Sequence, residues 1–204
     1  MARYSAEHKR QTRARILAAS DGLLKERGAD GASVDAVMRR AGLTVGGFYA
    51  HFASKDELER ETLLYGLEAS MDRLLDPIEG IAVDRAWLKA LIRRYLAQAD
   101  NPDLGAACPL TLLLPEVARG DAPFQSAFAT CTGAMLDRVE ARFPETAGMT
   151  RREAAIAVFA SCAGAVAFAR TVPAPHARAR ILRATETMLT ETFGLDDSPG
   201  AGVA

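Results

Sequence analysis

The stretch Thr44-Val45-Gly46-Gly47-Phe48-Tyr49-Ala50-His51-Phe52 decides the fold that we expect for this chain. Before it, residues 33–41 place four apolar side chains at the spacing of one helical face, namely Val34, Val37, Met38 and Ala41. Ser33 can cap the start of this helix, and Gly42 is the residue type at which a helix readily ends. Thr44 can then cap a second helix. Two short helices joined by a glycine-containing turn are typical of a helix-turn-helix that reads DNA.

The second helix has one side that we expect to be buried and one side that is almost bare. At about 100° per residue, the inward side is formed by Val45, Phe48 and Phe52. The opposite side is formed by Gly46, Gly47 and Ala50, with Tyr49 and His51 on the two flanks. Glycine inside a helix costs up to ~1 kcal/mol relative to alanine, so two in succession indicate that another molecule approaches the backbone closely. The alternative is a short amphipathic helix whose surface glycines have no such role.

A phosphate-lined major groove fits the bare face. The Tyr49 hydroxyl, the His51 imidazole and the Lys55 ammonium group can all reach phosphate oxygens. Few side chains on this face can hydrogen-bond to base edges, so direct readout would rest on methyl contacts of Val45 and Ala50 with thymine, on the helix start around Asp35 and on the N-terminal arm. Groove shape would then contribute much of the selectivity. The predicted DNA contacts are Ser33, Asp35, Thr44, Val45, Gly46, Gly47, Tyr49, Ala50, His51 and Lys55.

Residues 44–58, TVGGFYAHFASKDEL, closely resemble the signature of the tetracycline-repressor-like (TetR) family of bacterial transcription regulators. Residues 9–43 also match the N-terminal pattern of that family. The close match covers about the first quarter of the chain, and the remainder matches in length and helical character. The resemblance implies an all-α fold, in which an N-terminal three-helix helix-turn-helix DNA-binding domain precedes a C-terminal helical ligand-binding and dimerisation domain.

The charge distribution agrees with this division. Residues 1–55 carry ten Lys or Arg against five Asp or Glu, whereas residues 56–204 carry fifteen against twenty-one. A basic head on an acidic body is expected of a modular DNA-binding protein. We therefore expect a DNA-binding domain at residues 1–55, an effector-binding and dimerisation domain at residues 56–195, and a disordered Gly- and Pro-containing tail at residues 196–204.

Helix starts and stops predict the remaining elements. Residues 1–9 are expected to form a flexible arm; Arg3, Lys9, Arg10, Arg13 and Arg15 can touch phosphates or a minor groove, although a solvated basic terminus explains them equally well. Capping boxes begin at Ser54 and Thr150. The expected helices cover residues 6–27, 54–75, 85–99, 109–119 with a break at Pro115, 121–143, 150–171 and 176–193.

The final two helices are the expected dimer interface. Residues 154–169 are apolar on most sides, and a helix of that kind must bury most of its sides. By resemblance, two subunits pair these helices in a four-helix bundle, and the two heads then read a palindromic operator. The predicted interface residues are Ala155, Val158, Cys162, Val166, Ile181, Thr185, Met188 and Leu189. An ordinary buried core helix is the alternative.

The middle helices are expected to line an effector pocket. By resemblance, a small molecule bound there shifts the separation of the heads and releases DNA. The predicted lining is Trp87, Leu91, Tyr95, Cys108, Leu112, Phe124, Phe128, Cys131, Met135 and Phe159. This lining favours a mostly apolar or aromatic effector, although each residue is also compatible with a plain core position.

Cys108 offers a second mechanism. It precedes Pro109, which is favoured at the first position of a helix, and a thiol at a helix N-terminus is stabilised as the thiolate. Some regulators of the TetR family use a cysteine in a similar Gly-Cys stretch as a sensor. Cys108 is therefore either an electrophile or oxidant sensor or a small buried hydrophobic residue.

Other function classes are disfavoured. The three histidines, His8, His51 and His176, have no metal-ligand spacing with cysteine or carboxylates, and no nucleophile constellation or phosphate-binding glycine loop is present. We expect no enzyme activity, no cofactor and no metal. Residues 1–15 contain no secretory signal, and residues 154–169 are too short for a comfortable membrane span, so a cytoplasmic protein is expected. An activator, or a nucleoid-type protein without an effector site, remains an alternative to a repressor.

Overall fold

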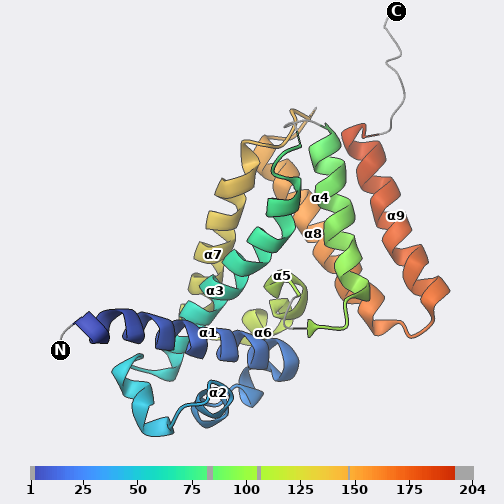
Figure 1. Ribbon diagram of the computed structural model, residues 1–204. Coiled ribbons are helices and arrows are strands. Elements are labelled where there is room, and N and C mark those ends of the chain that lie inside the picture. Colours follow the sequence, from blue (N-terminus) through green and yellow to red (C-terminus); the bar gives the residue numbers. More distant parts are fainter. Residues whose placement is uncertain (1–2, 82–84, 105–106, 147, 196–204) are drawn as a thin grey trace, which may run out of the picture. The chain divides into compact units, whose positions relative to one another are not determined.

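The computed structural model describes residues 3–81, 85–104, 107–146 and 148–195, and it confirms the all-α fold (Figure 1). The α-helices are α1 (Arg3–Gly31), α2 (Val34–Arg40), α3 (Lys55–Leu75), α4 (Arg85–Ala97), α5 (Pro109–Leu112), α6 (Leu114–Arg119), α7 (Ala122–Glu140), α8 (Arg151–Thr171) and α9 (Pro175–Phe193). Three 3₁₀ helices are η1 (Val45–Ala50), η2 (Asp76–Ile78) and η3 (Gln98–Asp100). Asp84, whose residue type suits the cap of the helix expected from residue 85, lies outside the described residues, as does the predicted tail, residues 196–204.

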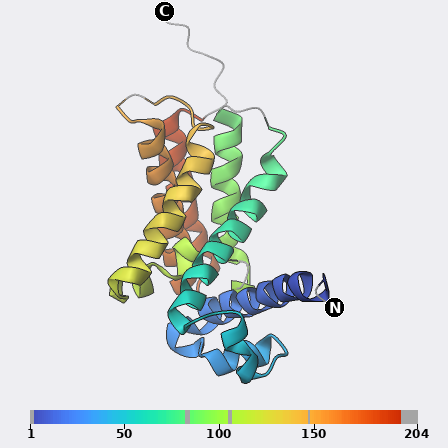
Figure 2. The ribbon, with the colours of Figure 1, turned by 90° about the vertical axis from the view of Figure 1, so that its left-hand side faces the viewer.

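The chain divides into two compact units. The N-terminal unit comprises Met1–Asp72 and Asn101–Met135, and the C-terminal unit comprises Arg73–Asp100 and Leu136–Ala204. Within the N-terminal unit, α2 packs against both α1 and η1 (Figure 2). Its buried apolar residues include Ile16, Leu23, Leu24, Val37, Met38, Phe48, Phe52 and Leu58.

The first helix differs from its prediction at its start. It begins at Arg3 rather than at residue 6, so the stretch from Arg3 to Lys9 is helical and is not the flexible arm that we expected. Its regular part ends where predicted, because Gly28 has a φ of 71°, a conformation that residues with a Cβ rarely adopt. A Cβ at Gly28 would also overlap the Glu116 carboxylate from α6.

Local caps delimit the two helices around the turn. Ser33 Oγ accepts a hydrogen bond from the Ala36 N–H at 3.3 Å, which confirms its capping role, and Gly42 ends the helix region with a φ of 69°. Thr44 adopts the extended backbone of a cap, but its side chain makes no capping hydrogen bond. Ser54 Oγ accepts from the Glu57 N–H at 3.1 Å, as in a capping box. The Glu57 carboxylate accepts from the Ala53 N–H at 2.6 Å, whereas a standard capping box would use the N–H of Ser54 itself.

In the C-terminal unit, α4, α8 and α9 pack side by side (Figures 1 and 2). The capping box at Thr150 is complete: Thr150 Oγ1 accepts from the Glu153 N–H at 3.2 Å, and Glu153 Oε2 accepts from the Thr150 N–H at 2.8 Å. Edge-on ring contacts join Trp87 to Phe143 and Tyr95 to Phe159, at centroid distances of 5.8 and 5.9 Å.

The structure bears on two predictions: that residues 154–169 are too short to span a membrane, and that a helix breaks near Pro115. The helix Arg151–Thr171 is long and apolar enough to cross a membrane by composition, contrary to the expectation that it is too short. Half of the most apolar stretch of this helix is buried inside the protein. Packing of α8 against α4 and α9 accounts for its apolar composition. The predicted break near Pro115 is confirmed, since α5 ends at Leu112 and α6 begins at Leu114.

Candidate nucleic-acid interface

Two buried aromatic residues anchor the six-residue η1 helix in the N-terminal unit. Phe48 and Phe52 are 0% and 1% exposed, and their rings stack with centroids 5.8 Å apart. Tyr49, by contrast, is 75% exposed and meets Phe48 edge-on at 5.2 Å. The anchor therefore fixes the inner side of η1 and leaves the opposite side open to another molecule.

The glycine face of η1 is open as the sequence predicted. A Cβ added at Gly46 would meet nothing within 4 Å, and one at Gly47 would meet only Met38 Cε, at 3.9 Å. Ala50 is exposed beside them. Packing inside the described chain therefore does not require glycine at position 46, which is consistent with a role in approach to an external partner.

One member of the predicted inner side was placed wrongly. Val45 is 43% exposed, whereas we expected it to be buried with Phe48 and Phe52. Val45 is the first residue of a short 3₁₀ turn, where the angular repeat and the depth of burial of a longer α-helix do not apply. Its side chain therefore stands on the surface, where the predicted DNA contacts lie.

The predicted DNA contacts come from three short segments of the N-terminal unit: the start of α2, η1 with its flanks, and the start of α3. The exposed members are Ser33, Asp35, Thr44, Val45, Gly46, Tyr49, Ala50 and Lys55, and the half-buried members are Gly47 and His51. Their accessibility suits contact with a partner, and contact of each with DNA stays a prediction.

His51 is held mainly in its neutral form. Burial, followed by the positive charges of Lys9, Arg13 and His8, lowers its pKa from the usual value. Its Nδ1 atom is buried and makes no hydrogen bond within the described residues. A contact from this imidazole to a phosphate would therefore use a neutral N–H group near pH 7.

The glutamates at the start of α3, Glu57, Glu59 and Glu61, do not form a solvated face. Each of the three is half-buried and has a partner. Glu57 caps the helix, Glu59 lies 3.0 Å from Lys55 Nζ, and Glu61 pairs with Arg13. The Lys55 ammonium group is consequently shared with Glu59, and a phosphate must compete for it.

Two arginines predicted to touch phosphates instead hold the head together. Arg13 donates a hydrogen bond to the His51 carbonyl oxygen and pairs with Glu61. Arg15 Nη2 donates to the Ala41 carbonyl oxygen at 2.5 Å. These partners are distant in sequence from the arginines, so sequence periodicity contained no signal for them.

Further arginines line a surface hollow between α1 and α2 that sequence reasoning missed. Its volume is about 520 Å³, and its lining is Leu23, Arg27, Ala36, Arg39 and Arg40. Arg40 forms two 2.7 Å hydrogen bonds with the Glu26 carboxylate, and Arg39 pairs with Asp35. Asp35, a predicted DNA contact, thus presents a carboxylate already paired with a neighbouring guanidinium.

The predicted effector residues divide between the two units. In the C-terminal unit, Trp87, Leu91, Tyr95 and Phe159 are buried. In the N-terminal unit, Cys108, Phe128, Cys131 and Met135 are buried, and Leu112 and Phe124 are half-buried.

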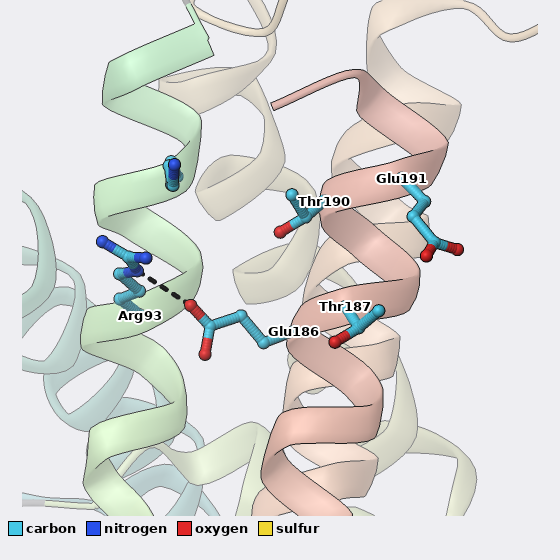
Figure 3. Close-up of a pocket in the computed structure, with 6 residues that line it drawn as sticks. Arg93, Glu186, Thr187, Thr190 and Glu191 are labelled. Atoms are coloured by element: carbon cyan, nitrogen blue, oxygen red, sulfur yellow. Dashed lines mark hydrogen bonds and ion pairs between the residues drawn. The ribbon is translucent and has the colours of Figure 1, made fainter. Parts of the chain in front are cut away.

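A pocket of about 210 Å³ in the C-terminal unit contains none of the predicted effector residues. It is lined by Lys89, Arg93, Glu186, Thr187, Thr190 and Glu191 (Figure 3). Its Arg93–Glu186 ion pair, 2.8 Å long, makes it unlike the apolar pocket that we expected (Figure 3).

The three cysteines are buried and form no disulfide. Burial raises the pKa of Cys162 to about 12 and also raises the pKa of Cys131. Cys108 lies at the N-cap of α5, as predicted, and is 2% exposed. This burial favours the interpretation of Cys108 as a core residue over that of a freely accessible thiol.

Most of the predicted dimer-interface residues lie inside their own subunit. Ala155, Val158, Cys162, Val166 and Leu189 are buried, Ile181 and Thr185 are half-buried, and only Met188 of the eight is exposed. The first five pack within the C-terminal unit, so they are not available to a second copy and their assignment is corrected. The exposed face of α8 carries Ile156, Ala160, Gly164 and Phe168 at four-residue spacing, with Ile156 47% and Phe168 60% exposed.

Comparison with known proteins identifies the chain's relatives. Residues 16–62 match the family model for bacterial regulatory proteins of the tetR family. HTH-type transcriptional regulator UidR from Escherichia coli (strain K12) is 37% identical over 70 residues, which cover 34% of this chain and 36% of UidR. The chain thus spans about a third of the length of the curated relatives that it matches.

Solved structures extend the similarity to the whole fold. The reduced form of E. coli NemR superposes with a TM-score of 0.76 at 18% identity, covering 92% of this chain and 99% of NemR. FadR from Bacillus subtilis in complex with stearoyl-CoA has a TM-score of 0.65 at 14% identity and covers 86% and 96% of the two chains. The helix-turn-helix and the family model agree that residues 16–62 resemble bacterial regulatory proteins of the tetR family, and the solved structures show that the similarity of fold extends over most of the chain.

Proposed function

We propose that this chain is a transcriptional repressor that binds a palindromic DNA operator as a homodimer and leaves it when a small, mostly apolar effector binds. The observation that carries the proposal is η1, whose open glycine face stands on the buried anchor of Phe48 and Phe52. In this proposal residues 1–55 bind DNA, and residues 56–195 bind the effector and the second subunit.

The chemistry of the exposed face supports DNA as the partner. Tyr49, His51 and Lys55 supply hydrogen-bond donors for phosphate oxygens. Val45 and Ala50 supply methyl groups that suit thymine. Because the glycines supply no side-chain donors, sequence-dependent groove shape contributes the remaining selectivity.

The exposed apolar face of α8 supports a homodimer. A row made of Ile156, Ala160, Gly164 and Phe168 leaves two large apolar side chains in water when the subunit is alone. The small residues between them allow a second helix to approach closely. A twofold contact through this face, joined by Met188 of α9, gives two heads for a palindromic site.

An apolar effector is supported by the buried side chains and by one relative. FadR from B. subtilis was solved with stearoyl-CoA, a ligand with a long apolar chain. Most of the aromatic and sulfur-containing side chains predicted for the effector are buried within one unit or the other, and the residues of each unit are a candidate site by themselves. Regulators of this family are generally non-enzymatic, so we assign no catalytic residue, cofactor or metal, and we place the protein in the cytoplasm.

A redox- or electrophile-sensing regulator that acts through Cys108 is the second candidate. It is supported by the N-cap position of Cys108 and by the similarity to NemR, which was solved in a reduced form. Its 2% exposure argues that the thiol must become accessible by local opening before it reacts.

Selection of genomic DNA fragments by the purified chain tests the proposed function. We expect enrichment of a sequence with inverted symmetry, and we expect a mixture of fatty-acyl and aromatic compounds to contain members that release it. A thiol-reactive electrophile that releases the DNA, together with loss of that effect in Cys108→Ala, would instead favour the second candidate. Failure to enrich any sequence at low salt would overturn the operator-binding proposal.

A further inference from the structure

Arg13 joins three segments of the N-terminal unit that are far apart in sequence. From α1, its Nη1 donates to the His51 carbonyl oxygen at the end of η1, and its Nη2 pairs with Glu61 in the second turn of α3. Glu57 provides a second carboxylate at 3.5 Å. The guanidinium carbon lies 4.1 Å from the centre of the Phe52 ring. The side chain is 29% exposed, so these contacts occupy most of its surface.

A short 3₁₀ helix needs such a contact. Isolated helices of this length are unstable in water, and 3₁₀ hydrogen bonds have poor geometry, so tertiary contacts must define where η1 ends. A cation at the carbonyl end of a helix is stabilised by the helix dipole, and Arg13 occupies that place beside His51. Glu57 and Glu61 in turn hold the guanidinium against the start of α3.

We propose that Arg13 is a positioning residue for DNA recognition, which orients Tyr49 and His51 through the end of η1 and does not itself bind phosphate. The inference rests on the proposed DNA-reading role of η1. It replaces the expectation that Arg13 belongs to a set of arginines that touch DNA, because its terminal nitrogens already have partners inside the protein.

Salt dependence separates positioning from phosphate contact. Each phosphate contact contributes about −0.9 to the slope of log affinity against log salt concentration. For Arg13→Gln we expect at least about a tenfold loss of DNA affinity with an unchanged salt slope. A slope that becomes less steep by about 0.9 would overturn the proposal, since it would show that Arg13 neutralises a phosphate.

Two matched variants sharpen the test. Glu61→Gln removes a negative charge from the head, which by simple electrostatics should strengthen DNA binding; the proposal expects weaker binding, because Arg13 loses its partner. Arg10→Gln is the control for loss of one positive charge from the same helix without loss of a contact to η1, since the Arg10 side chain is 77% exposed and pairs only with Glu7 among the contacts described. Stronger DNA binding by Glu61→Gln would contradict the proposal.

A measurement on the free protein distinguishes failure of this inference from failure of the proposed function. The His51 and Phe52 amides both donate to the Phe48 carbonyl oxygen, at 2.9 and 3.1 Å. Hydrogen exchange at these amides should accelerate in Arg13→Gln and Glu61→Gln but not in Arg10→Gln. Equal protection of these amides in all variants would overturn the positioning role of Arg13 even if the protein binds DNA. If exchange is faster in Arg13→Gln and Glu61→Gln but the wild type binds no DNA, Arg13 still holds the end of η1 and the proposed function is wrong.

Discussion

Asp21 and Lys25 form an ion pair inside the N-terminal unit, with Asp21 Oδ2 2.7 Å from Lys25 Nζ and the Lys25 side chain fully buried. The pair lies against α3, where a Cβ at Gly66 would overlap Asp21 Oδ1. A buried charge that loses its partner is strongly unfavourable, whereas a pair replaced as a whole by uncharged groups can be neutral.

Asp21→Ala should therefore lower the free energy of unfolding by about 3–5 kcal/mol, because it removes the carboxylate that lies 2.7 Å from the buried Lys25 ammonium. The double variant Asp21→Ala/Lys25→Met should recover part of that loss. Urea unfolding followed by circular dichroism measures both. If the loss of unfolding free energy in the double variant equalled the sum of the losses in Asp21→Ala and in Lys25→Met, the pairing would not be the source of the loss.

Lys55 should contribute affinity without sequence preference. Lys55→Ala is expected to weaken binding to operator and to unrelated DNA alike and to make the salt slope less steep by about 0.9. Glu59→Gln frees the Lys55 ammonium from its 3.0 Å ion pair and should strengthen binding to both DNAs. Fluorescence anisotropy over a range of salt concentrations measures these effects. A large change in relative sequence preference after Lys55→Ala would contradict its assignment to phosphate.

The exposed face of α8 should carry the dimer. Phe168→Glu places a charge in the proposed interface and should shift the protein toward monomer in analytical ultracentrifugation at micromolar concentration. Leu114→Glu is the control, because Leu114 is a large exposed apolar residue of α6, 45% exposed, outside that face. Dimers that persist in Phe168→Glu but dissociate in Leu114→Glu would place the interface elsewhere.

His51 should make the protein less stable in acid. Because its pKa is lowered in the folded state, the unfolded chain binds a proton at a higher pH than the folded chain does. This contribution to stability is present above a pH of about 6.5 and is lost as the pH falls from there through the lowered folded-state pKa. The drop in urea midpoint between pH 7.5 and pH 5.0 should be smaller in His51→Gln than in the wild type. Equal drops would show that His51 is not held neutral.

The cysteines should differ in their rate of alkylation. We expect Cys162 to react most slowly, since burial raises its pKa to about 12 and leaves little thiolate. The sensing alternative expects Cys108 to react first and its modification to weaken operator binding. Mass-spectrometric mapping after limited alkylation measures the order. Labelling led by Cys131 or Cys162 would end the sensing alternative.

The head could be predicted from the sequence because its signals are local. Ser33, Gly42 and the capping box at Ser54 each act within a few residues of their own position, and the structure has helix ends there. The buried pair Phe48 and Phe52 followed from spacing alone.

Long-range contacts and the choice between two apolar faces could not be predicted. Arg13 meets Glu61 across 48 residues, and no pattern around either residue indicates the other. In α8, small apolar residues occur on both sides, so periodicity does not say whether Val158 or Phe168 faces the subunit core; packing against α4 and α9 decides it. Val45 was placed wrongly for a related reason, because the helical wheel assumed an α-helix where the chain forms a 3₁₀ turn.

The central claim is that the glycine face of η1 lies against DNA, and the variant Gly46→Leu tests it most directly. A Cβ at this position meets nothing within 4 Å, so the substitution should leave thermal stability unchanged or slightly raised. The longer side chain should block close approach to the groove, and we expect affinity for the selected operator to fall at least about tenfold in an anisotropy titration. A fully stable Gly46→Leu protein that binds the operator as tightly as the wild type would contradict the placement of η1 on DNA.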